Sequence, residues 1–189
     1  MSIIEDGRGS GKKAGVTENN RLNTTSRTES RIYYASDREE KAFSVYGKRN
    51  FAAGGQTNEN ILSLTYTGND RLYIKDIMFS SNSPDAKVEV YFDATSISGG
   101  SSVTPLNINR SSAEDSETTC LNGATDLTAT VEDANEVFDV RLSNSSFLMD
   151  FHSAIILPKN ANILILGSVQ TAGEKIRIMV YYYEASEEV

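Results

Sequence analysis

The stretch KVEVYFD, residues 87–93, decides the fold class because its apolar and polar residues alternate. Val88, Val90 and Phe92 fall on one face of an extended chain, and the residues between them fall on the other. An amphipathic helix would instead need apolar residues spaced three and four positions apart. The stretch therefore predicts a β-strand with one buried face.

The same two-residue period continues on both sides of that stretch. It covers residues 61–66, 136–142 and 175–184, and in residues 72–79 the apolar face changes near Asp76, which predicts a bulge. Turn-forming clusters separate the runs, and only residues 37–41 allow a short helical turn. With shorter runs at 33–34 and 42–46 we count about eight or nine strands. This pattern predicts an all-β fold, an antiparallel β-sandwich of the jelly-roll type.

Two regions break the alternation. Residues 94–135 are acidic and poor in large apolar side chains, which predicts an extended surface excursion. Residues 154–157 and 162–166 are apolar without alternation, as in strands covered on both faces. The second cover is either another subunit or, for a central strand, the same subunit. We take four residues of these runs as candidates for an oligomer interface: Ile155, Leu157, Ile163 and Ile165.

Composition divides the chain into an arm and a body. Residues 1–30 have almost no apolar periodicity and predict an extended, mobile N-terminal arm, whereas residues 31–189 contain the strand pattern. The net charge of -8 argues against nucleic-acid binding, because phosphate contacts need clustered cations. No apolar run is long enough for a membrane helix, and the start MSIIEDGRGSGKK does not resemble a signal peptide. We expect neither membrane insertion nor signal-directed export.

The glycine-rich arm does not fit a nucleotide-binding loop. Such a loop needs a glycine, any four residues, and then Gly-Lys-Ser/Thr. When the motif is aligned on Gly11-Lys12, Asp6 stands in place of the first glycine and Lys13 in place of the serine or threonine. No strand precedes the stretch and no amphipathic helix follows it, so the backbone amides that cradle phosphate lack a scaffold. We expect no bound nucleotide.

Catalytic and metal sites are equally hard to assign. His152 is the only histidine and would share a strand face with Asp150, as a base and its orienting carboxylate do, but nothing marks a nucleophile. An ordinary hydrogen-bonded histidine is the interpretation we favour. Cys120 is the only cysteine, and the acidic residues 113–117 lack the spacing of a calcium loop. We predict a non-enzymatic protein with no catalytic, cofactor or metal site.

Three stretches in order carry a family resemblance. They are DGRGSG through NRL at 6–22, TPLNINRS at 104–111 and the final strand RIMVYYYE at 177–184. Together they resemble virion structural proteins of tailed bacteriophages, of the head-decoration (cement) and head-fibre type. No collagen-like repeat or long heptad stretch is present, which favours a compact cement protein over a fibre.

The resemblance implies a jelly-roll protein that forms a homotrimer on the outer surface of a phage head. The implied partner is the major capsid protein, and no cofactor is implied. The glycines would let the arm follow an irregular surface, and four cations would supply hydrogen-bond donors to the capsid. These candidates are Arg8, Lys12, Lys13 and Arg21. Two alternatives remain: another virion component from the tail, neck or receptor-binding apparatus, or a carbohydrate-active jelly roll.

Overall fold

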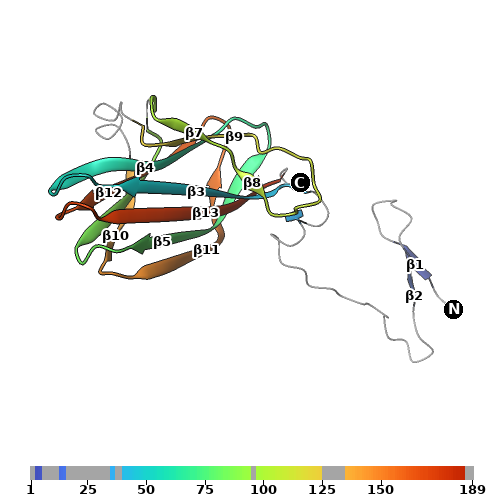
Figure 1. Ribbon diagram of the computed structural model, residues 1–189. Coiled ribbons are helices and arrows are strands. Elements are labelled where there is room, and N and C mark those ends of the chain that lie inside the picture. The colour runs from blue at the N-terminus through green and yellow to red at the C-terminus, as the bar shows by residue number, and fades with distance from the viewer. Residues whose placement is uncertain are drawn as a thin grey trace. The chain divides into compact units, whose positions relative to one another are not determined.

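Two antiparallel β-sheets form the body of the protein in the computed structural model (Figure 1). The structure describes residues 3–5, 13–15, 35–36, 40–94, 97–124 and 135–185. The chain divides into two units, Met1–Ser30 and Arg31–Val189. The strands of the second unit are β3 (Ala42–Asn50), β4 (Gln56–Tyr66), β5 (Arg71–Ser81), β6 (Ala86–Phe92), β7 (Ser101–Val103), β8 (Leu106–Asn107), β9 (Thr118–Asn122), β10 (Asn135–Leu142), β11 (Ser146–Leu157), β12 (Asn162–Val169) and β13 (Lys175–Ala185).

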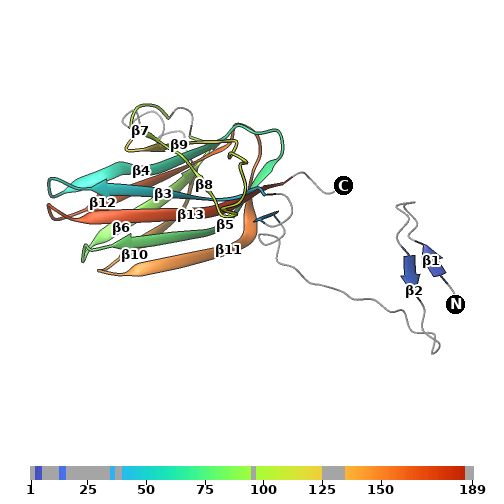
Figure 2. The same cartoon turned by 45° about the vertical axis from the view of Figure 1, so that its right-hand side comes forward.

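The order of the strands is that of a jelly roll. One sheet has the order β10-β6-β12-β4-β9-β7 and the other β11-β5-β13-β3-β8. The eight long strands cross between the sheets so that β3 and β13, the first and last of them, lie side by side (Figures 1 and 2). Two interlocked Greek keys produce this arrangement. The predicted all-β sandwich is confirmed.

The core lies between the sheets and consists of the residues that the alternation selects. Val88 and Val90 of β6 are fully buried, as are Ile176, Ile178 and Tyr182 of β13. The predicted bulge is also present. Tyr181 pairs with Asp76 and Tyr182 with Ile74, which leaves Lys75 as the extra residue of β5.

The excursion between β6 and β10 contains more structure than its composition predicts. β7 pairs with β9 and β9 with β4, while β8 pairs with β3. These short strands therefore extend both sheets on the same side of the sandwich (Figure 2). They cover the backbone edges of β3 and β4, which would otherwise be open to pairing with another chain.

The apolar run of β12 is explained by its central position. The strand pairs with β4 on one side and β6 on the other. Ile163 and Ile165 are 1% exposed, Leu157 is 3% exposed, and all three belong to the core, against which Ile155 packs. For Leu157, Ile163 and Ile165 the sandwich itself supplies the cover, which is the second of the two explanations that the sequence left open, whereas Ile155 is only partly buried.

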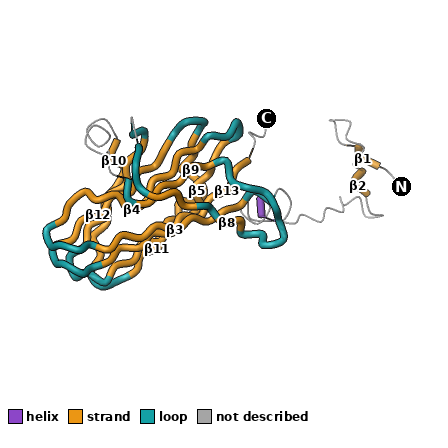
Figure 3. The backbone as a smooth tube through the Cα atoms, turned by 45° about the horizontal axis from the view of Figure 1, so that its top comes forward, coloured by secondary structure: helices purple, strands orange, loops and turns teal. Residues whose placement is uncertain are grey.

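Two short segments differ from the sequence expectations. In the first unit, β1 (Ile3–Glu5) pairs antiparallel with β2 (Lys13–Gly15), although the composition predicted no regular structure there. The β-branched pair Ile3-Ile4 favours a strand locally. Helical backbone occurs at Ala35 and Ser36 (Figure 3), upstream of the expected residues 37–41, of which the described Glu40 and Lys41 are not helical. The strand predicted at 33–34 lies outside the described residues.

Candidate functional site

The Asp150–His152 pair is a local feature of a bulge. The register between β11 and β5 shifts between Asp150 and Ile155, and His152 and Ser153 both have positive φ. The carboxylate of Asp150 accepts the backbone N–H of His152 at 2.8 Å and the Lys75 ammonium at 2.6 Å. The Lys75 contact, followed by the backbone bond, lowers the pKa of Asp150 to about 2. Such a carboxylate is a poor general base near neutral pH, where the optimal pKa lies close to 7.

Cys120 is an unreactive thiol, and the acidic residues that the structure describes form no metal site. Burial raises the pKa of the Cys120 thiol to about 12, so it stays protonated and unreactive. Among the described residues, no group of three or more His, Cys, Asp or Glu side chains could hold a metal ion. In those same parts of the chain, no helical segment has the length and hydropathy needed to cross a membrane.

A buried polar cluster fastens the end of the excursion to the last strand. Glu184 of β13 is 1% exposed, and its carboxylate accepts the Ser116 hydroxyl at 2.6 Å and the backbone N–H of Glu117 at 3.0 Å. The Tyr182 hydroxyl lies 2.8 Å from that of Ser116 and 2.7 Å from that of Thr118. Burial raises the pKa of Glu184. These hydrogen bonds connect the start of β9 to the core, which is a structural role.

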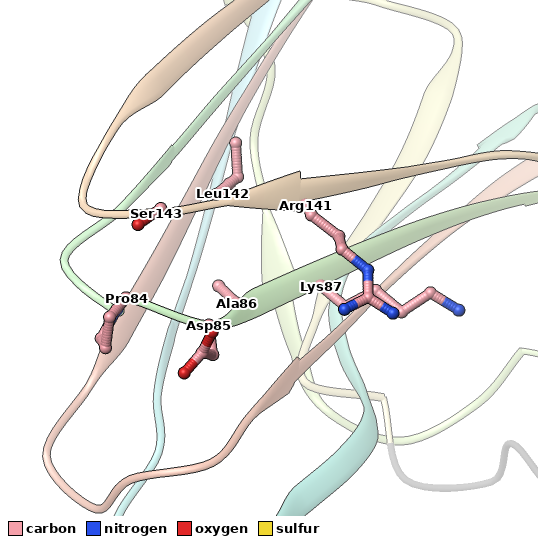
Figure 4. A pocket seen from close by; sticks show the side chains of 7 residues that line it. All are labelled: Pro84, Asp85, Ala86, Lys87, Arg141, Leu142 and Ser143. Atoms are coloured by element: carbon pink, nitrogen blue, oxygen red, sulfur yellow. The ribbon is translucent and has the colours of Figure 1, made fainter.

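A hollow of about 310 Å³ lies where β6 begins and β10 ends (Figure 4). Lys87 and Arg141, which face each other in the register of these strands, extend side by side along it. The Lys87 ammonium lies 2.7 Å from the Glu89 carboxylate, whereas no described carboxylate forms an ion pair with Arg141. One free cation in an open hollow does not define a ligand.

The stretch 104–111 forms a well-anchored loop around β8. The Asn107 side-chain amide donates to the Glu40 carbonyl at 2.6 Å, and that of Asn109 donates to the Ser36 carbonyl at 3.0 Å. The backbone N–H of Ile108 donates to the Ala42 carbonyl at 2.8 Å. From this anchored backbone, Leu106 is 56% exposed and Ile108 is 38% exposed. The loop holds two large apolar side chains in solvent at fixed positions.

The outer face of the five-stranded sheet carries a second exposed apolar group. Leu148 pairs with Met78, Met78 with Met179, and Met179 with Tyr46, so the four residues form one row across β11, β5, β13 and β3. Leu148 is 57%, Tyr46 43% and Met78 37% exposed, and Met179 is partly buried. We call this set the apolar row. The alternation of the sequence places these four residues at outward positions of their β-strands, where large apolar residues are unexpected.

The structure does not test the cations assigned to the arm. Arg8, Lys12 and Arg21 lie outside the described residues. Lys13 is in β2, where it pairs with Glu5 in the backbone register. The sequence reasoning missed the apolar row, since it followed the inward face of each strand. It did select the loop 104–111, through the resemblance.

Comparisons with known proteins give little support for a relationship. No family model matches the chain, and no curated protein matches it. One solved structure, described as that of infectious bursal disease virus Gx strain, aligns with 10% sequence identity and a TM-score of 0.18. That alignment covers 78% of this chain and 42% of the other. A similarity this low does not support any conclusion about fold or function.

Proposed function

We propose that this protein is a non-enzymatic virion structural protein that binds the outer surface of a phage head and stabilises it. Its partner would be the major capsid protein. The observation that supports this proposal most directly is the anchored loop 104–111, one of the three stretches that carry the family resemblance, because it presents Leu106 and Ile108 to solvent.

The hydrogen bonds of the loop make it suitable for docking. Its backbone is already fixed by Asn107, Asn109 and the amide of Ile108. A preorganised loop loses less conformational entropy on binding than a flexible one, so more of its contact energy becomes affinity. Exposed apolar side chains on such a loop resemble the small apolar centre of a protein–protein interface.

The arm adds a second contact in this proposal. Arg8, Lys12, Lys13 and Arg21 would bind carbonyl and carboxylate groups of the capsid protein. Exposed ion pairs contribute only about 0–1 kcal/mol each, so the four cations would act as a set. The resemblance also implies a homotrimer, in which several arms would bind at once and raise the overall avidity.

A different virion component, from the tail, neck or receptor-binding apparatus, is the second candidate. An enzyme is less well supported, because the one carboxylate–histidine pair has a carboxylate whose pKa is lowered to about 2. A carbohydrate-active jelly roll would need two placed carboxylates at the bond to be cleaved. The alternatives differ in where the protein is found on the particle.

Electron microscopy of intact particles, with the protein present and absent, tests the proposal. We expect density for the sandwich on the outer surface of the head, and a lower temperature of head disruption when the protein is missing. Density confined to the tail or neck would contradict the proposal.

Two changes then test the contacts. Leu106→Asp with Ile108→Asp should weaken head binding at least about tenfold, because burying two carboxylates in an apolar contact is unfavourable. Val137→Asp, at a position on β10 that is 45% exposed, is the matched control and should bind normally. Deleting residues 1–30 should leave a folded body with weaker, less salt-sensitive binding. If the deleted protein decorates heads as well as the intact one, the arm has no docking role.

A further inference from the structure

The apolar row lies between two rows of different charge on the outer face of the five-stranded sheet. On one side Arg177 pairs with Lys48 across β13 and β3. Both cations are exposed, and neither has an ion-pair partner among the residues that the structure describes. We call these two residues the basic row.

On the other side of the apolar row the charge is mainly negative. Asp150 pairs with Asp76, and Asp76 with Tyr181, across β11, β5 and β13. Lys75 lies beside both carboxylates, 3.1 Å from Asp76 and 2.6 Å from Asp150. One lysine cannot neutralise two aspartates, so this side keeps a net negative charge. We call Asp76 and Asp150 the acidic row.

This arrangement is complementary to itself. A two-fold axis that runs along the apolar row, across the strands, places the apolar row of one copy over that of the other. The same rotation reverses the strand direction and carries the basic row of each copy over the acidic side of its partner. Arg177 then lies above Tyr181, one strand away from Asp76. An axis along the strands would instead place like charges together.

The size of the face is compatible with a weak pair. Four long strands spaced about 4.8 Å apart, over roughly seven residues of about 3.3 Å each, present roughly 440 Å² per copy. A standard stable interface buries about 800 Å² per partner, and weaker complexes bury less. Methionine and tyrosine at the centre with arginine at the rim is the composition of a typical interface.

We propose that the outer face of the five-stranded sheet binds a second copy of this chain, related by a two-fold axis along Tyr46, Met179, Met78 and Leu148. The inference concerns the isolated protein and differs from the homotrimer that the resemblance implies, so self-association and head binding are tested separately. The face proposed for self-association is not one that the sequence had indicated as an interface. The modest area is typical of weaker, reversible complexes.

Sedimentation of the purified full chain tests the proposal directly. We expect the mass to approach twice the chain mass of 20.7 kDa as the concentration rises. Met78→Lys with Leu148→Lys places like charges on the axis and should give a monomer at every concentration tested. Val137→Lys, on the other sheet, should pair as the wild type does. Circular dichroism checks that each variant retains its β-sheet signal.

Charge reversal tests the orientation of the pair. Arg177→Glu should weaken pairing about tenfold, because the two-fold axis repeats each rim contact. Adding Asp76→Arg in the same chain should restore most of that loss. A wild-type monomer, a trimer, normal pairing of the Met78→Lys, Leu148→Lys variant, or failure of the second reversal to rescue the first would each overturn the proposal.

Discussion

The two outer faces of the sandwich differ in how their apolar residues are covered. On the six-stranded sheet, Leu164 and Leu166 of β12 point outward, yet both are fully buried in a cluster with Tyr91, Ala94 and the partly buried Ile97. On the five-stranded sheet, Leu148 and Met78 also point outward, and they remain exposed. The chain buries Leu164 and Leu166 on one face, whereas on the other face it covers Ala42 and Tyr183 at one end of the sheet and leaves Leu148 and Met78 in solvent.

This difference separates stability from binding. An apolar residue that the chain covers contributes to folding, since its burial removes surface from water. One that stays exposed contributes little to the monomer and is available to a partner. Two strands with the same alternation of apolar and polar residues can therefore contribute differently to stability and to binding. The difference depends on whether other parts of the chain cover their outward side chains.

The largest expected effect compares two leucines on the opposite faces. Leu166→Ala should lower the free energy of unfolding by about 2–5 kcal/mol, because it leaves a cavity in the cluster that contains Tyr91, Ala94 and Ile97. Leu148→Ala should change it by no more than about 0.5 kcal/mol. Urea unfolding at low protein concentration measures both without a contribution from pairing. Equal losses would show that the faces do not differ in this way.

Partial removal of the cover should have an intermediate effect. Ile97→Ser should cost about 1–2 kcal/mol of unfolding free energy, because a partly buried apolar side chain is lost. It should also increase the binding of a hydrophobic dye, as Leu164 and Leu166 become accessible. Leu148→Ser is the matched control and should reduce dye binding. An Ile97→Ser protein with unchanged stability would contradict the covering role.

The buried carboxyl of Glu184 should make stability fall as pH rises. Burial raises its pKa in the folded state above the ordinary value of 4.5, so the folded protein holds the proton more tightly than the unfolded chain. The stabilisation is complete below the unfolded pKa and is lost as pH rises through the folded pKa. In urea unfolding, Glu184→Gln should therefore gain stability relative to the wild type as pH rises above the ordinary value of 4.5 toward the raised folded-state pKa. A constant difference across that range would contradict it.

The smallest effect should come from Asp150, beside the apolar row, and it should have the opposite sign. Its pKa is lowered to about 2, chiefly by Lys75, so its contribution is present above the unfolded pKa and is lost as pH falls toward that value. Because the carboxylate is solvent-exposed, screening makes the contribution small. Asp150→Asn should unfold like the wild type at neutral pH, and a large loss there would contradict this.

Much of the fold could be predicted from the sequence. The inward residues of β6 and β13, and the bulge at Lys75, follow from local alternation, which is a property of each strand alone. The pairing of β9 with β4 and of β8 with β3 could not be predicted, because these strands are short and their pairing depends on distant neighbours. The central position of β12 left two explanations of its apolar run open for the same reason.

The candidate surfaces were less predictable. Each residue of the apolar row looks like an isolated outward position in its own strand. Only the register of four strands aligns Leu148, Met78, Met179 and Tyr46. The loop 104–111 could be selected from sequence through its resemblance, but its anchoring by Asn107 and Asn109 depends on the segment that precedes β3.

Site-specific cross-linking tests the central claim, that the exposed face is where two copies meet. Met78→Cys provides a unique reactive thiol, because Cys120 is 1% exposed and its pKa is raised to about 12. Facing sheets lie about 10 Å apart, so a short bismaleimide is better suited than a disulfide to join the two thiols. The control is Lys87→Cys on the opposite sheet. Covalent dimer from Met78→Cys but not from Lys87→Cys is the result we predict, and equal or no cross-linking from both would contradict the claim.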